Sequence, residues 1–223
     1  GTAAAEGALL ALRKARKKNR ILVARNLHPE YIEIIETYIK DLEEYSIDYV
    51  DFDPATGTVK IDDLDAKICD TCAGFLFQSP NFFGVIEDGK QIADTLHAKK
   101  AFAVQVVTEA YSLPFLTPGG ENGVDIMVGE AQSFGLPLGF GGPFLGFMAV
   151  KKDFIRQMPG RLVGETVDSN GDRGYVLTLS TREQHIKREK ATSNICTNQA
   201  WCAMRAGMFM STMGKKGLMD IAK

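Results

Sequence analysis

The sequence predicts an α/β domain in which a mostly parallel sheet is flanked by helices. Short apolar runs alternate along the chain with segments whose apolar residues recur at helical spacing. The apolar runs are nearly continuous, which is typical of strands covered on both faces. With 45% hydrophobic and 24% charged residues, the 223-residue chain has the composition of an ordinary folded protein. Disorder and low-complexity repeats are therefore excluded.

The expected helices begin or end at recognisable residues. The first has Thr2 near its start and a basic run at its end, as capping and the helix dipole favour. Pro29 opens the second, because proline suits the first helical turn. The expected helices cover residues 2–18, 29–39, 61–68, 87–98, 182–190 and 198–213.

The expected strands lie between these helices. They cover residues 21–23, 47–52, 73–77, 102–107, 125–128 and 147–150. From residue 161 the alternation of strands and helices stops. Two further expected strands, 161–167 and 175–179, flank a turn that contains Asn170-Gly171. An Asn-Gly pair between two such runs predicts a β-hairpin.

Charge and hydropathy exclude two classes of partner. The net charge of −2 with no basic stripe argues against nucleic acid as a partner. No apolar run approaches the ~20 residues that span a bilayer, and the layout of a signal peptide is missing. We therefore expect no membrane partner and a place in the cytoplasm or an organelle matrix.

The four cysteines are too sparse for a disulfide framework, which fits a reducing compartment. Cys69 and Cys72 have the two-residue gap of a redox or zinc pair, but no second pair or close histidine completes a tetrahedral set. We favour the simpler interpretation of one cysteine at a helix end and one in a strand. A redox role for the pair remains open.

Two glycine-rich loops, residues 117–123 and 139–146, need backbone freedom that glycine gives most readily. Neither has the ending of a phosphate-binding P-loop, so tight turns are the favoured interpretation. The whole interval 101–150 contains no Lys, Arg or His. An amine nucleophile or a cationic clamp cannot come from this interval.

A polar cluster precedes the last expected helix. Thr192, Ser193, Asn194 and Thr197 place three hydroxyls and an amide where free backbone N–H groups of a helix start also point outward, which suits an anion. Plain N-capping is the competing interpretation, but it explains one of the four residues. His185 is interpreted as a structural or packing residue, and His28 and His97 have no Ser or Cys partner at nucleophile spacing, so no catalytic triad is predicted.

Several motifs resemble the glycine cleavage system P-protein family, specifically its N-terminal half, which many prokaryotes make as a separate subunit 1. The most specific is the run Ala191-Thr192-Ser193-Asn194-Ile195-Cys196-Thr197. The supporting segments are residues 78–84, 139–143, 160–168, 182–186 and 190–200.

The resemblance implies the type I fold of enzymes that depend on pyridoxal phosphate (PLP). It implies that residues 1–160 form the large α/β domain, 161–180 a β-hairpin, and 181–223 a helical segment leading toward a small domain. It also implies that the chain is the central part of subunit 1, with the small domain largely missing.

The resemblance further implies an activity. The family decarboxylates glycine, with PLP as an electron sink, and transfers the aminomethyl group to the lipoyl group of H-protein. In the catalytic half, a lysine that bonds PLP precedes a loop ending Gly-Gly-Pro; here Gln132 occupies that place. A neutral amide cannot form an imine, so no catalytic residue is expected in this chain. Glu109 lies near the place of the acid that pairs with the pyridine nitrogen, and we interpret it as vestigial or structural.

By the same resemblance, Thr192, Ser193 and Asn194 reach the PLP phosphate of the partner, catalytic subunit 2, within a heterotetramer. Two alternatives remain open. One is a self-sufficient PLP enzyme that uses Lys151 or Lys152, and the other is a pseudo-active module for assembly or regulation. On the favoured interpretation the chain alone is inactive. Its oligomeric state stays open, with a homodimer that imitates the native pairing as one option.

Overall fold

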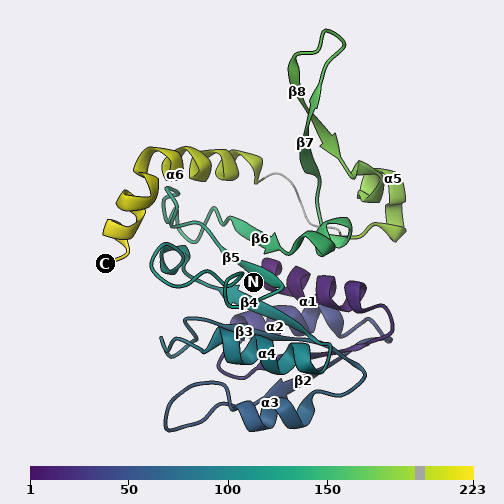
Figure 1. Ribbon diagram of the computed structural model, residues 1–223, viewed down its shortest axis with the longest axis vertical. Helices are drawn as coiled ribbons and strands as arrows, with labels where there is room; N and C mark the ends of the chain where they lie inside the picture. Colours follow the sequence, from purple (N-terminus) through teal and green to yellow (C-terminus); the bar gives the residue numbers. More distant parts are fainter. Residues whose placement is uncertain (194–198) are drawn as a thin grey trace.

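The computed structural model describes residues 1–193 and 199–223, and of Arg182 the backbone alone. Its centre is a six-stranded sheet with the order β2-β1-β3-β4-β5-β6 (Figure 1). The strands are β1 (Arg20–Ala24), β2 (Ser46–Val50), β3 (Cys72–Gln78), β4 (Phe102–Val107), β5 (Ile126–Glu130) and β6 (Gly146–Val150). All neighbouring pairs are parallel except β5 and β6, which are antiparallel. The mostly parallel sheet is confirmed.

Helices cover both faces of this sheet (Figure 1). They are α1 (Thr2–Ala15), α2 (Pro29–Ile39), α3 (Ile61–Lys67) and α4 (Gly89–Ala98). Side chains alternate along β1, so Ile21 and Val23 pack with α1 and α2, whereas Leu22 packs with α3 and α4. Burial on both faces is why the strands read as continuous apolar runs.

Local sequence signals set most helix starts. Pro29 is the first residue of α2, as expected. The helix expected from residue 87 begins instead at Gly89, because the Asp88 carboxylate caps it by accepting a hydrogen bond of 2.9 Å from the backbone N of Gln91. Glu87 therefore lies outside the helix, in the loop that precedes it, where its carboxylate accepts hydrogen bonds from other loops.

The predicted hairpin is confirmed as β7 (Leu162–Val167) paired antiparallel with β8 (Arg173–Thr178). Gly171 adopts a positive φ of 86°, and Asp168 Oδ1 accepts hydrogen bonds from the backbone N of Asn170 and Asp172. The hairpin extends away from the sheet, toward the top of Figure 1.

The single helix expected over residues 182–190 is wrong. The segment instead forms two 3₁₀ turns, η3 (Ser180–Arg182) and η4 (Arg188–Lys190), around a single-turn helix, α5 (Gln184–Lys187). Neither α5 nor η4 buries a residue. A helix of this length is stable only when one of its faces packs on the rest of the protein, so a longer helix does not form here. Two further 3₁₀ helices are η1 (Ala110–Ser112) and η2 (Lys152–Gln157).

The last helix, α6 (Ala200–Ile221), is longer than the expected 198–213, whose first residue lies outside the described residues. Gly214 is non-helical within it, with φ 61°, so the expected end coincides with a kink. Cys202 and Ala206 pack α6 on the loops that follow β4 and β5. Among the helices that the structure describes, none has the length and apolar character that a membrane crossing requires.

Candidate functional site

The loops at the carboxyl ends of the parallel strands meet at one edge of the sheet, where ligands of open α/β sheets bind. Gln132 lies in the loop after β5, two residues beyond its last residue, Glu130. Its backbone N donates to Glu130 Oε1 (3.0 Å) and its side-chain Nε2 donates to the carbonyl of Pro137 (3.2 Å). The amide of Gln132 therefore stabilises its own loop, and it is no nucleophile.

The alternative lysines lie at the other edge of the sheet. Because β6 is antiparallel, Lys151 follows it at the amino edge, where its Nζ donates to Asp125 Oδ1 (2.7 Å) and to the carbonyl of Gly123 (2.8 Å). The length of β5, about 16 Å at ~3.3 Å per residue, separates this edge from the loop of Gln132. Lys152 follows at the same amino edge. The geometry gives no support to a self-sufficient PLP enzyme built on these lysines.

Glu109, in the loop after β4, makes contacts typical of a structural residue. Its Oε1 accepts hydrogen bonds from the backbone N of Tyr111 (3.1 Å) and from Ser133 Oγ (2.6 Å). These bonds cap η1 and join the loops after β4 and β5. The interpretation of Glu109 as structural agrees with this arrangement.

Polar groups of three neighbouring loops meet at Thr108, the residue before Glu109. Gln78, at the end of β3, accepts a hydrogen bond of 2.9 Å from the backbone N of His28 and donates to Thr108 Oγ1 at 3.2 Å. The loops after β1, β3 and β4 are thus joined through one buried amide. These groups can hold a polar molecule by hydrogen bonds, but none supplies an amine.

Sequence reasoning missed a second polar network at this edge, built on the buried Glu87. Its Oε1 accepts hydrogen bonds from Nδ2 of Asn26 and Asn81, each 2.7 Å long, and its Oε2 accepts from the backbone N of Val59 at 3.0 Å. The network joins the loops after β1, β2 and β3. Its sequence signal is an asparagine within three residues of the end of a buried strand, Asn26 after β1 and Asn81 after β3.

The predicted phosphate-contact residues fall in the segment before α6. Ser193 Oγ donates a hydrogen bond to Oε1 of Glu6 in α1, whose residue exposure is 3%. Thr192 is half-buried, and Asn194 and Thr197 lie outside the described residues. The Ser193 hydroxyl therefore has a partner within this chain, which the sequence did not reveal.

The Cys69 and Cys72 thiols are free. Cys69 follows α3 and Cys72 begins β3, as the simpler interpretation predicted. Hydrogen bonds from Thr71, aided by Arg20, lower the pKa of the exposed Cys69, whereas burial raises the pKa of Cys72 to about 11. Within the described ranges, no cluster of three or more His, Cys, Asp or Glu residues could hold a metal ion.

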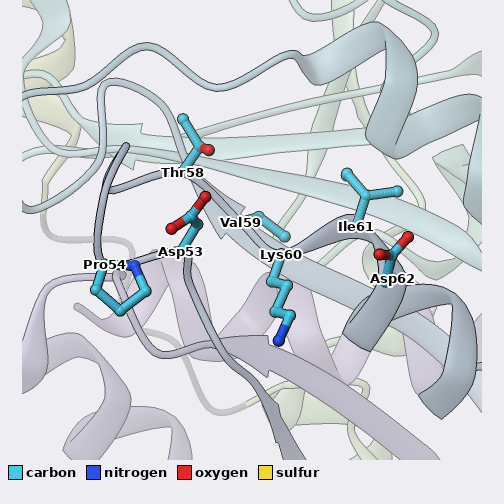
Figure 2. Close-up of a pocket in the computed structure, with 7 residues that line it drawn as sticks. All are labelled: Asp53, Pro54, Thr58, Val59, Lys60, Ile61 and Asp62. Carbon is cyan, nitrogen blue, oxygen red and sulfur yellow. The ribbon is translucent and has the colours of Figure 1, made fainter.

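A cavity of about 310 Å³ lies in the connection between β2 and α3. Figure 2 shows Asp53, with its carboxylate beside Thr58, and Lys60 at its wall. β2 is at the far side of the sheet, four strands from β5, so at about 4.8 Å per strand a distance of ~19 Å separates the strand that leads into this cavity from the strand that leads into the loop of Gln132. It is separate from the predicted cofactor region.

Comparison with known proteins gives a consistent result. The family profile described as "Glycine cleavage system P-protein" matches residues 1–223. The probable glycine dehydrogenase (decarboxylating) subunit 1 of Koribacter versatilis (strain Ellin345) is 52% identical, with 100% of this chain and 49% of the relative covered. Its counterpart in Bacillus licheniformis is 49% identical, with 100% and 48% covered. The chain thus spans about half the length of the curated relatives it matches.

Solved structures agree with the fold. A crystal structure of glycine decarboxylase (P-protein) of the glycine cleavage system, in inhibitor-bound form, has a TM-score of 0.90 and 41% identity, covering 98% of this chain and 48% of that chain. A Lactobacillus brevis glutamate decarboxylase, with a TM-score of 0.67, 13% identity and coverage of 99% and 49%, shows the fold alone. The expected type I fold is confirmed.

Proposed function

Because this chain belongs to the glycine cleavage system P-protein family, we propose that it is the subunit of a glycine decarboxylase that does not bond the cofactor. The observation that carries the proposal is the amide of Gln132 in an interval without any lysine, at the position that the family resemblance equates with the cofactor-bonding lysine. PLP, when bound to the partner, supplies the electron sink for glycine decarboxylation. The residues around Gln132 do not fit covalent attachment of PLP, so we assign no catalytic step to this chain.

The proposed assembly is a cytoplasmic heterotetramer with catalytic subunit 2. It acts on glycine and passes the aminomethyl group to the lipoyl group of H-protein. In it, residues 1–160 form the large α/β domain, 161–180 the hairpin, and 181–223 the helical segment that leads toward the small domain. What supports a partner subunit is the subunit 1 name of the relatives.

The segment with Thr192, Ser193 and Asn194 is proposed to contact the phosphate of PLP held by the partner. Thr192 and Asn194 are the candidate ligands, and Ser193 takes a supporting position, because its hydroxyl bonds Glu6. A phosphate accepts strong hydrogen bonds from hydroxyl and amide groups, so two such residues suit it.

The first test asks which chain bonds the cofactor. We expect that borohydride reduction of the reconstituted complex, loaded with PLP, fixes PLP to one lysine of subunit 2 and to none in this chain, as read by peptide mass spectrometry. The control is this chain alone with the same PLP concentration, which measures adventitious labelling of surface lysines. Stoichiometric labelling of a lysine in this chain within the complex would contradict the proposal.

The second test concerns the phosphate contact. A Thr192→Ala/Asn194→Ala variant in the complex is expected to bind PLP at least tenfold more weakly, since each hydrogen bond to a charged group is worth ~1.5–3 kcal/mol. The measurement is PLP affinity by absorbance titration of the apo complex. Asn19→Ala/Thr56→Ala, at two exposed residues of the connections that precede β1 and follow β2, is the matched control. Equal PLP affinity of the two variants would refute the contact.

A further inference from the structure

Helix α1 carries one carboxylate on a face that is otherwise small and apolar. Ala4, Ala5 and Ala8 of this helix are fully buried. Glu6 lies among them with 3% exposure, and a Cβ added at the next residue, Gly7, would lie 3.1 Å from the Val128 side chain of β5. The helix therefore lies against the sheet and removes this carboxylate from water.

Among the described residues, the buried carboxylate has two close partners. Ser193 Oγ, 187 residues away in sequence, donates a hydrogen bond to Glu6 Oε1. Arg13 Nη2 lies 3.7 Å from Glu6 Oε2 and also donates to the carbonyl of Gln157 at 3.4 Å. The ion pair is longer than a hydrogen bond, so among the described residues the Ser193 hydroxyl is the donor that contacts the carboxylate directly.

A carboxylate withdrawn from water favours any arrangement that supplies it with a donor. Among the described residues, Glu6 Oε2 has no hydrogen-bond partner, which leaves the bond at Oε1 as the strong contact. The docked position of Ser193 is therefore favoured about tenfold or more over an undocked one, as for hydrogen bonds to charged groups. Docking of Ser193 also restrains Thr192, its neighbour in the chain.

We infer that Glu6 is a positioning residue, which acts through the Ser193 hydroxyl to hold the segment that carries Thr192 in place for contact with the partner-bound phosphate. The inference rests on the proposed function and deepens it. Glu6 does not touch the phosphate in this scheme. Glu6 affects PLP binding only by holding Ser193, and this dependence on Ser193 can be tested.

The experiment uses the complete subunit reconstituted with the catalytic subunit, in four variants: Glu6→Ala, Glu6→Gln, Ser193→Ala and the double variant Glu6→Ala/Ser193→Ala. Each is measured for PLP affinity and for amide hydrogen exchange of the peptide ending at Ser193. We expect Glu6→Ala and Ser193→Ala each to weaken PLP binding about tenfold. Glu6→Gln should retain part of the affinity, because its amide oxygen can still accept the hydroxyl.

The double variant decides the route. If Glu6 acts through Ser193, the double variant is no weaker in PLP binding than the weaker single variant, because one interaction is removed twice. Additive losses would overturn the inference. Exchange near Ser193 should rise in Glu6→Ala while that of β3 stays unchanged, which separates loss of position from global destabilisation. Unchanged exchange near Ser193 would also overturn it.

The two readouts separate this inference from the proposed phosphate contact. One outcome is faster exchange near Ser193 in Glu6→Ala while both Glu6→Ala and Thr192→Ala/Asn194→Ala bind PLP with normal affinity. It would show that Glu6 docks the segment and that the proposed phosphate contact is wrong. Weaker PLP binding in Thr192→Ala/Asn194→Ala with normal binding in Glu6→Ala and in Ser193→Ala would keep the contact and overturn the positioning role. Ser193 is half-buried, so its variant keeps the test valid if Glu6→Ala folds poorly.

Discussion

Replacing Glu87 by Ala is expected to lower the free energy of unfolding by about 3 kcal/mol or more. The carboxylate is buried, and its two oxygens accept hydrogen bonds from Asn26, Asn81 and the backbone N of Val59. Removing it leaves these donors buried with fewer acceptors, and each buried unsatisfied group costs about 1–3 kcal/mol. Urea denaturation followed by circular dichroism measures the loss.

Two companion variants make this result specific. Glu87→Gln keeps the shape, but its amide NH₂ group faces other donors, so its stability should lie between the wild type and Glu87→Ala. Glu44→Ala, at an exposed site, should change the free energy of unfolding by no more than about 0.5 kcal/mol. Equal stability of Glu87→Ala and Glu44→Ala would show that the Glu87 network does not stabilise the fold.

The second large effect is expected from Phe75→Ala, with a loss of about 3–5 kcal/mol in the free energy of unfolding. Phe75 lies on the central strand β3, is fully buried and stacks on Phe77 with ring centroids 6.1 Å apart. Truncation removes a large apolar side chain and leaves a cavity between the sheet and helices α3 and α4, which cannot close fully. The same urea measurement applies.

Phe115→Ala is the matched control, because Phe115 is 58% exposed and loses little buried area on truncation. We expect its free energy of unfolding to stay within about 0.5 kcal/mol of the wild type. A Phe75→Ala variant as stable as Phe115→Ala would mean that the packing between β3, α3 and α4 contributes much less than its burial indicates.

Much of the fold could be predicted because its signals are local. The apolar run of β3, the proline that opens α2 and the Asn170-Gly171 turn each lie within a few consecutive residues. The prediction failed at residues 182–190, where charged residues were assigned to one solvated helix. Helicity there would need an apolar face packed on the rest of the protein, and α5 and η4 have none.

The candidate site divides in the same way. The absence of lysine from residues 101–150 and the amide at Gln132 are properties of the sequence, so the proposal that this chain does not bond the cofactor could be made from the sequence directly. The hydrogen-bond donors to Glu87 could not be predicted, because they come from loops after three different strands. Which loops meet depends on strand order, and no local pattern encodes that order.

The sequence by itself determined the α/β alternation, the hairpin and the absence of lysine from residues 101–150, since each follows from residue types at short spacing. The tertiary structure alone decided two points. Because β6 is antiparallel, Lys151 lies at the amino ends of the parallel strands, whereas Gln132 lies at their carboxyl ends. The path of the chain also brings Ser193 to Glu6. The physical reason is that both depend on contacts between residues far apart in the chain, which only the packed fold selects.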